Sequence, residues 1–152
     1  MIEIKSKLTG EVLTTIFGDS LAGADLAEVD LTVADLAEQD LSGANLEGAD
    51  LSVADLRQAN LTGANLRGAT LVGANLENAT LTNVDLREAN LTGANLAGAT
   101  LRNAVLKGAR MFRASMESIV LTGAQYDDRT EFPALFFDPE RKGAIHVPVE
   151  ES

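Results

Sequence analysis

The residues of this chain that are best suited to chemistry are its acids. The sequence holds 23 Asp and Glu residues against 12 Lys and Arg, and many aspartates recur at intervals of five, each directly before a leucine. General acid–base catalysis needs carboxyl groups that converge on one substrate. If the chain coils as argued below, consecutive aspartates lie on different sides of the coil and diverge. The acids therefore do not predict a catalytic pair.

Other catalytic and ligand-binding residues are scarce. The single histidine, His146, lies between Ile145 and Val147 in the C-terminal tail, where we expect a structural role. The chain has no cysteine, which excludes disulfides and thiolate metal sites. We find no Ser-His-Asp set, phosphate-binding loop or metal motif. The sequence therefore predicts no enzyme activity, no catalytic residue, no cofactor and no metal.

The dominant feature of the sequence is an apolar residue at every fifth position. From Leu21 to Leu121, 19 of 21 such positions are Leu, the exceptions being Met111 and Met116, and 16 of the 21 positions two residues earlier are Ala. On an α-helix, at about 100° per residue, steps of five would scatter the leucines around the cylinder. On a flat strand, an odd spacing would send them to alternate faces. The chain must instead turn once per five residues, which predicts a solenoid with leucines inside.

The tandem A(D/N)Lxx units, such as GANLEGADLSVADL at 43–56, resemble the pentapeptide repeat family. The resemblance covers residues 19 to about 126. It implies an all-β fold, a right-handed quadrilateral β-helix with four pentapeptides per coil, one coil per 20 residues, and Leu and Ala pointing inward. We expect an N-terminal β-hairpin cap at 1–18, a β-helix of about five coils at 19–126, and a C-terminal cap and tail at 127–152.

Both ends depart from the repeat and are expected to cover the open coils. Residues 2–16 alternate apolar and polar types around a Thr-Gly turn, which indicates a β-hairpin. Asp138 and Pro139, followed by Gly143, predict a one-turn helix with Asp138 as N-cap and Pro139 at its first position. The Phe-rich tail around 132–137 is a lid or, alternatively, a dimer contact.

Two positions within the repeats carry specific expectations. Of the 21 positions two residues after each central Leu or Met, 10 are Gly and three are Asn, which tolerate positive φ. Val33, Val53 and Glu88 occupy the same position, so we expect a mixture of turn types. Gln39 replaces Ala in the inward column and is expected to point inward with its amide hydrogen-bonded.

Every twentieth residue should form a column on one side of the coil. One side carries the outward apolar residues Val33, Val53, Val72 and Phe112, our candidate partner face. Its occupant is the Phe-rich tail, a second copy of the chain or another protein; alternatively, the valines only favour β-structure. Another side carries a basic column, Arg67, Arg87 and Lys107.

Stacked columns also bring charges together. We expect opposite-charge neighbours at Glu47 with Arg67 and at Arg57 with Glu77. The like charges Asp30 with Asp50, and Asp35 with Asp55, should lie about one strand spacing apart, so mild acid or a divalent cation should stabilise that end.

The function that fits these features best is a non-enzymatic rigid scaffold or protein-binding module of unknown partner. The alternative is a DNA mimic that binds DNA gyrase, because some members of the family resembled do so through an acidic surface. Here residues 1–60 hold 12 acids and 3 bases, whereas residues 61–126 hold 4 acids and 6 bases, so the acids girdle one end. Ice binding by threonine arrays is a third, weaker hypothesis. We expect a cytoplasmic protein that binds neither membranes nor nucleic acid directly, with a homodimer through the tail or the valine side as an option.

Overall fold

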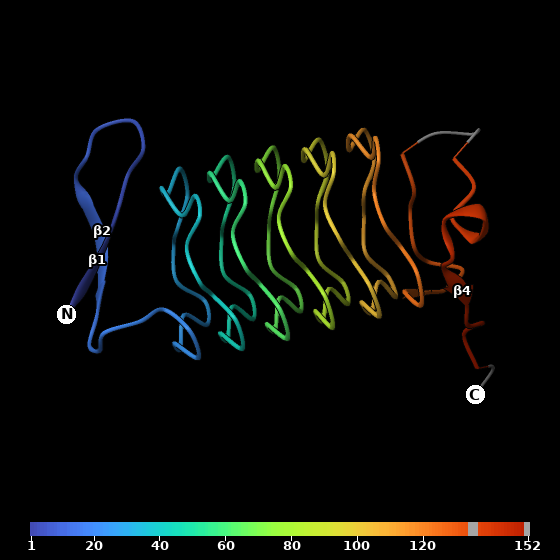
Figure 1. Ribbon diagram of the computed structural model, residues 1–152, viewed down its shortest axis with the longest axis horizontal. Helices are drawn as coiled ribbons and strands as arrows, with labels where there is room; N and C mark the ends of the chain where they lie inside the picture. Colours follow the sequence, from blue (N-terminus) through green and yellow to red (C-terminus); the bar gives the residue numbers. More distant parts are fainter. Residues whose placement is uncertain (134–136, 151–152) are drawn as a thin grey trace.

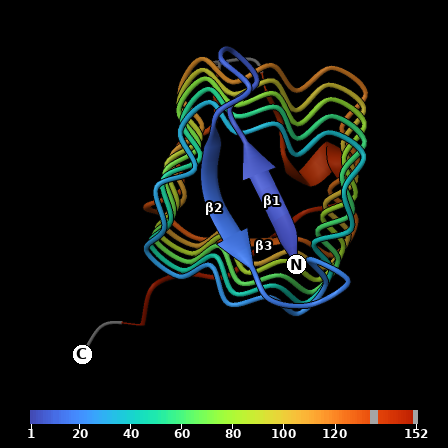
Figure 2. The same ribbon diagram turned by 90° about the vertical axis from the view of Figure 1, so that its left-hand side faces the viewer.

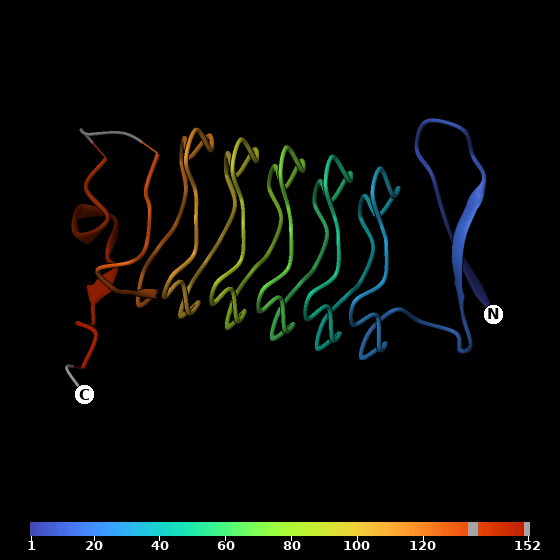
Figure 3. The ribbon, with the colours of Figure 1, turned by 180° about the vertical axis from the view of Figure 1, so that it is seen from behind.

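The chain forms a four-sided β-helix with a cap at each end (Figure 1). The computed structural model describes residues 1–133 and 137–150. Seen from the N-terminal end, successive coils superimpose into a square outline, and the two strands of the first hairpin lie across it (Figure 2). The view from behind shows the coils stacked along one axis between the two caps (Figure 3). Within the described residues, no helix has the length and hydrophobicity needed to cross a membrane.

A backbone ladder between coils sets the repeat at 20 residues. Parallel bridges join each residue before a central leucine to its equivalent in the next coil, as in Thr70 with Asn90. From Leu26 to Met111, the N–H of each central residue donates to the next coil, as from Leu71 to the Asn90 carbonyl at 2.7 Å. These bonds satisfy backbone groups that would otherwise be buried without partners. The ladder confirms four pentapeptides per coil.

The interior is filled by the two predicted columns of small and medium apolar side chains. Every central residue from Leu21 to Leu121 is buried, and most have no exposed surface. The alanine column is also buried from Ala44 onward, and Ala74 is 0% exposed. An interior this narrow needs no aromatic residue, which explains an aromatic content of only 4%.

The corners of the coil all use one backbone conformation, and our expectation of mixed turn types was wrong. Every residue two positions after a central residue has positive φ, including Val33 at 57°, Val53 at 58° and Glu88 at 59°. The inter-coil hydrogen bonds on both sides of each corner fix the backbone, whatever residue occupies it. A β-branched residue in this region is strained by roughly 1–3 kcal/mol.

Gln39 is exposed, so our prediction that it points inward was wrong. The register does not slip there, because the Gln39 carbonyl still accepts the N–H of Asn60 at 3.0 Å and Leu41 is fully buried. The position belongs to the first coil, which has no coil before it. The Gln39 side-chain nitrogen lies 3.5 Å from the Ala37 carbonyl oxygen. Ala24 and Val29 of the same inward column are only partly buried. By contrast, Ala34, which is bridged to Ser6 of the hairpin, is fully buried.

The N-terminal cap is an antiparallel hairpin of β1 (Ile2–Lys5) and β2 (Val12–Ile16). Ile4 of β1 is 2% exposed and faces the first coil. The hairpin is joined to this coil by an antiparallel bridge between Ser6 and Ala34 and by the Lys7 N–H, which donates to the Val33 carbonyl at 2.9 Å. The hairpin therefore continues the ladder at one corner and covers the remainder with side chains.

The C-terminal cap contains β3 (Gln125–Tyr126), the 3₁₀ turn η1 (Glu140–Lys142) and β4 (Ile145–His146). Strand β4 pairs in parallel with β3 and extends the ladder. Pro139, not Asp138, occupies the N-cap position of η1. The Asp138 carboxylate still accepts the N–H groups of Glu140 at 3.1 Å and Arg141 at 3.2 Å.

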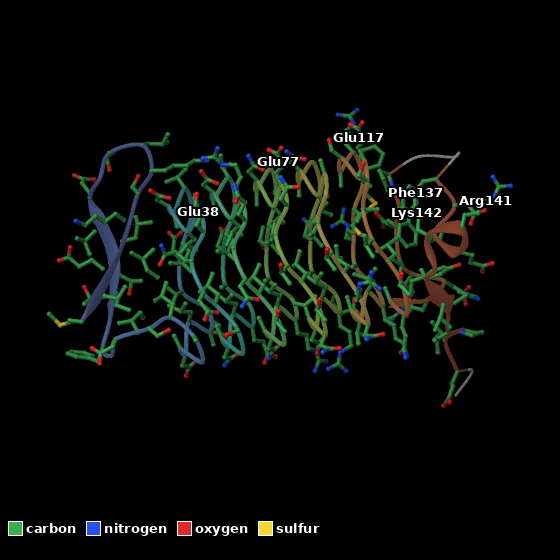
Figure 4. The ribbon with its side chains drawn as sticks, in the orientation of Figure 1. Glu38, Glu77, Glu117, Phe137, Arg141 and Lys142 are labelled. Carbon is green, nitrogen blue, oxygen red and sulfur yellow. The ribbon has the colours of Figure 1, made fainter. Side chains whose placement is uncertain are left out.

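The aromatic residues of the tail cover the last coil. Phe132 and Phe137 stack with ring centroids 5.3 Å apart, and Tyr126 meets Phe132 edge-on at the same distance. Figure 4 shows Phe137 at this end of the molecule, beside Lys142 and Arg141 of the cap. Both phenylalanines pack against the core, which supports the lid interpretation for the described part of the tail. Residue Phe136 lies outside the described residues.

Candidate functional site

The candidate partner residues occupy one side of the prism, which we call the valine face: the outward residues of the pentapeptides centred on Leu31, Leu51, Leu71, Leu91 and Met111. The ladder places them in successive coils, because the Val53 N–H donates to the Val72 carbonyl at 2.9 Å and the Gly93 N–H donates to the Phe112 carbonyl at 2.9 Å. Val53 is 46% exposed and Phe112 is 50% exposed, whereas Val33 and Val72 are partly buried.

The C-terminal tail, in its described part, packs on the core and on Tyr126. The Phe112 ring instead lies beside the Arg113 guanidinium, 5.1 Å from the ring centroid. The described phenylalanines of the Phe-rich tail, Phe132 and Phe137, therefore leave Phe112 50% exposed.

Charge changes sign along the valine face, as it does along the whole β-helix, although we did not assign this change to one face from the sequence. The residue before the central leucine is Asp30 or Asp50 in the first two coils, Thr70 or Asn90 in the next two, and Arg110 in the fifth. Arg113 adds a second cation at the C-terminal end. Arg110 lies 3.7 Å from Glu131, and both side chains are more than half exposed. Listing every twentieth residue from Asp30 onward would have revealed this change from acidic to basic residues.

The basic column holds fewer available cations than the sequence suggests. Arg67, Arg87 and Lys107 do stack on one side, because Gly68 donates to the Arg87 carbonyl and Glu88 donates to the Lys107 carbonyl. However, the Arg87 guanidinium binds both oxygens of Asp85 within its own pentapeptide, with distances of 2.5–3.0 Å. This arginine is therefore already paired.

Neither predicted ion pair between coils forms: Arg57 pairs within its own pentapeptide, and Glu47 accepts a hydrogen bond from an asparagine of the next coil. Arg57 binds both oxygens of Asp55 at 2.6–3.1 Å instead of pairing with Glu77. The Glu47 carboxylate accepts the side-chain amide of Asn65 at 3.2 Å rather than pairing with Arg67. An arginine two residues after an aspartate on the same strand can form a bidentate pair, which favours this geometry. Glu77 and Glu117 project from the prism, as Figure 4 shows.

The stacked aspartates do not behave as a repelling pair. Asp30 bridges Asp50, and Asp35 bridges Asp55, as predicted. Yet hydrogen bonds from Thr32 lower the pKa of Asp30, and the bidentate bond from Arg57 lowers the pKa of Asp55. Local donors thus stabilise the ionised form of both carboxyls, so mild acid is not expected to help this end. Among the described residues, no group of three or more acids and histidines could hold a metal.

The remaining titratable cluster lies in the C-terminal cap and has structural contacts. The His146 ring nitrogen Nε2 lies 2.8 Å from an Asp128 oxygen, and the ring lies 5.1 Å from that of Tyr126. Asp127, which we had not singled out, is 3% exposed. Its carboxylate accepts the Gly108 N–H at 3.0 Å, replacing the inter-coil bond that is lost where the chain leaves the repeat. The described part of the chain contains no pocket.

Comparison with known proteins was made at the levels of family, sequence and structure. The family model described as pentapeptide repeats matches in eight copies, at residues 20–58, 51–87, 59–96 and 89–124. No curated protein matches the chain significantly.

Several solved structures resemble the chain. AT2G44920, a pentapeptide repeat protein from the Arabidopsis thaliana thylakoid lumen, is 33% identical with a TM-score of 0.50, over 77% of this chain and 69% of that one. HetL, a pentapeptide repeat protein involved in heterocyst differentiation regulation in the cyanobacterium Nostoc sp. strain PCC 7120, is 26% identical with a TM-score of 0.53, over 82% and 73%. Rfr23 from the cyanobacterium Cyanothece 51142 is 32% identical with a TM-score of 0.47, over 73% and 89%.

Proposed function

The chain belongs to the pentapeptide repeat family, whose fold is the right-handed quadrilateral β-helix, and from this premise we propose that it is a non-enzymatic, rigid protein-binding module. The observation that carries the proposal is the valine face. There, Val53 stands exposed at a corner with positive φ and Phe112 stands exposed in the neighbouring column, while the other sides of the β-helix carry mostly polar and small residues.

Strain at Val33 and Val53 supports a role outside the fold. Ten of the 21 corners are glycine, which adopts positive φ without cost. The two valines stand in adjacent coils of one column, and Val53 is 46% exposed, so little burial offsets the strain. An exposed valine at a strained corner is explained if its side chain contacts another molecule. Exposed apolar patches on folded proteins commonly mark such contacts.

A comparative capture experiment tests the proposal. The full chain is immobilised and exposed to native lysate, and the recovered proteins are quantified for the wild type and for Val33→Lys plus Val53→Lys. Both side chains face outward, so the double variant should fold and melt like the wild type. We expect it to lose at least about 90% of a specific partner, because a contact worth about 1.4 kcal/mol already corresponds to tenfold in affinity.

The matched control places the same two charges on a different side. Asn83→Lys plus Asn103→Lys changes two corners in adjacent coils that also have positive φ, at 59° and 56°. The control should retain the partner. Equal recovery from both double variants would reject the valine face as the binding surface. The gyrase-binding alternative remains a prediction, and a supercoiling assay with the purified chain is its direct test.

A further inference from the structure

We infer that the valine face binds a second copy of the chain, with the two β-helices antiparallel. The inference deepens the proposed function and rests on it, because it names one occupant of the same surface. It is carried by the sign change of charge along the face. A two-fold axis at the middle coil, perpendicular to the helix axes, would place each acidic end over a basic end, the isologous arrangement of symmetric dimers.

The pairing follows from the coil ladder. The column formed by the residue before each central residue runs Asp30, Asp50, Thr70, Asn90, Arg110, with each member bridged to the next. The ladder then bridges Arg110 to Glu131 of the cap, whose carboxylate lies 3.7 Å from the Arg110 guanidinium, so Arg113 is the second cation that keeps this end basic. Reversing this column on itself sets Asp30 opposite the second copy's Arg110, and Thr70 opposite its own equivalent. By symmetry the Asp30–Arg110 pair forms twice. A parallel arrangement would instead bring the two acidic ends together, in a protein whose net charge is already −11.

The apolar residues of the face fit the same arrangement. In the corner column, Val53 lies opposite Gly93 of the second copy, and a Cβ built at Gly93 would meet no atom of its own chain within 4 Å. Space is therefore available for the valine. In the column after the central residues, Val72 meets its own equivalent, and Phe112 lies opposite Thr32, next to Val33. The centre of the face is thus matched, whereas at the ends of the corner column Val33 lies opposite Arg113 of the second copy.

The other three sides lack this self-complementarity. On the side of the basic column, reversal places Arg67 against Arg67. On the side centred on Leu76, it places Glu77 against Glu77. The fourth side, centred on Leu81, has an aspartate at one end, Asp40, but a valine at the other, Val120. Among the four sides, the valine face alone combines acids at one end, bases at the other and an uncharged centre.

The size of the face predicts a weak dimer. Five coils at about 4.8 Å spacing give a face roughly 25 Å long. Stable complexes bury about 800 Å² on each partner, and smaller interfaces are transient. Self-association should therefore appear at high protein concentration and should be easily displaced by a tighter partner.

Charge reversal tests the inferred register. Sedimentation velocity of the purified full chain, over roughly 10 µM to 1 mM, should show wild-type association that rises with concentration. Asp30→Arg alone and Arg110→Asp alone should each weaken it by at least about tenfold, because each places like charges opposite one another twice. An equimolar mixture of the two variants should associate again, since the introduced arginine of one variant then faces the introduced aspartate of the other.

Asp25→Arg is the matched control. It makes the same change of charge in the same coil, on the neighbouring side, and it also removes a turn hydrogen bond, since Asp25 and Asp30 each accept the N–H two residues later. It should associate like the wild type, and circular dichroism should show that all variants fold.

A monomeric wild type throughout this range, or a mixture that stays monomeric, would overturn the dimer. A monomeric wild type whose captured partner is still lost from Val33→Lys plus Val53→Lys would reject the dimer and leave the proposed function standing. Restored association in the mixture, with no other protein captured, would establish the dimer and reject the proposed heterologous partner.

Discussion

Ala74→Leu should destabilise the protein by at least about 1–3 kcal/mol, because the new side chain has no room in the interior. Ala74 is 0% exposed, and the residues above and below it in the column, Ala54 and Ala94, are equally buried. Leucine in place of alanine must push apart coils whose backbone spacing is fixed by the ladder. Urea unfolding monitored by circular dichroism gives the change in free energy.

The control for this substitution is Ala97→Leu, which adds the same atoms at an outward, partly buried position of the next coil. We expect a change within about 0.5 kcal/mol there, as for most surface substitutions. If Ala74→Leu were as stable as Ala97→Leu, the alanine column would not be limited by size.

Acid should lower the stability of the protein, in contrast to our interpretation of the stacked aspartates. The pKa values of Asp30, Asp40, Asp55, Asp85 and Asp127 are all lowered in the folded chain. For Asp85 the main cause is the hydrogen bond from Arg87; for Asp127 burial raises the pKa, but bonds from Arg129, Gly108 and Thr130 together outweigh it.

A lowered folded pKa gives stability that is present above the unfolded value, about 3.9 for Asp, and lost as pH falls through the folded value. The melting temperature should therefore fall from about pH 6 to about pH 2.5, by about 2–4 °C for each kcal/mol lost in a chain of this size. Asp55→Asn should flatten the curve, because it removes one contributing carboxyl. A melting temperature that rises on acidification would contradict these hydrogen-bond assignments and favour repulsion between stacked aspartates.

The sequence predicts the fold well because one short pattern is repeated 21 times. The period of five and the small residue two places earlier can be satisfied only by a coil, so Leu71 and Ala74 are placed correctly without coordinates. The prediction of side-chain direction fails in the first coil, and the prediction of corner conformation fails where the residue type is compatible with more than one turn. Gln39 occupies an inward position, but no preceding coil confines its side chain. Val33 and Val53 suggested other turn types, yet the ladder imposes positive φ on every corner.

Side-chain pairing was also hard to predict, because it depends on distances within and between coils. Arg57 can reach Asp55 in its own pentapeptide or Glu77 in the next coil, and only the structure shows that it binds Asp55 in a bidentate pair. The valine face itself was predicted from its columns. The change of charge along the axis was also noted from the sequence, but it was not assigned to this face, because Asp30 and Arg110 lie four coils apart in a single column.

The central claim, that Val53 is retained for contact with another molecule, is tested most directly by capture with Val53→Gly. This change removes the exposed side chain and relieves its strained backbone, so a lost interaction cannot come from damage to the fold. Asn83→Gly, a corner with φ of 59° on another side, is the matched control. We predict that the partner recovered by the wild type and by Asn83→Gly is lost with Val53→Gly. Equal recovery by all three proteins would contradict the claim and leave the valine column with no role beyond β-structure.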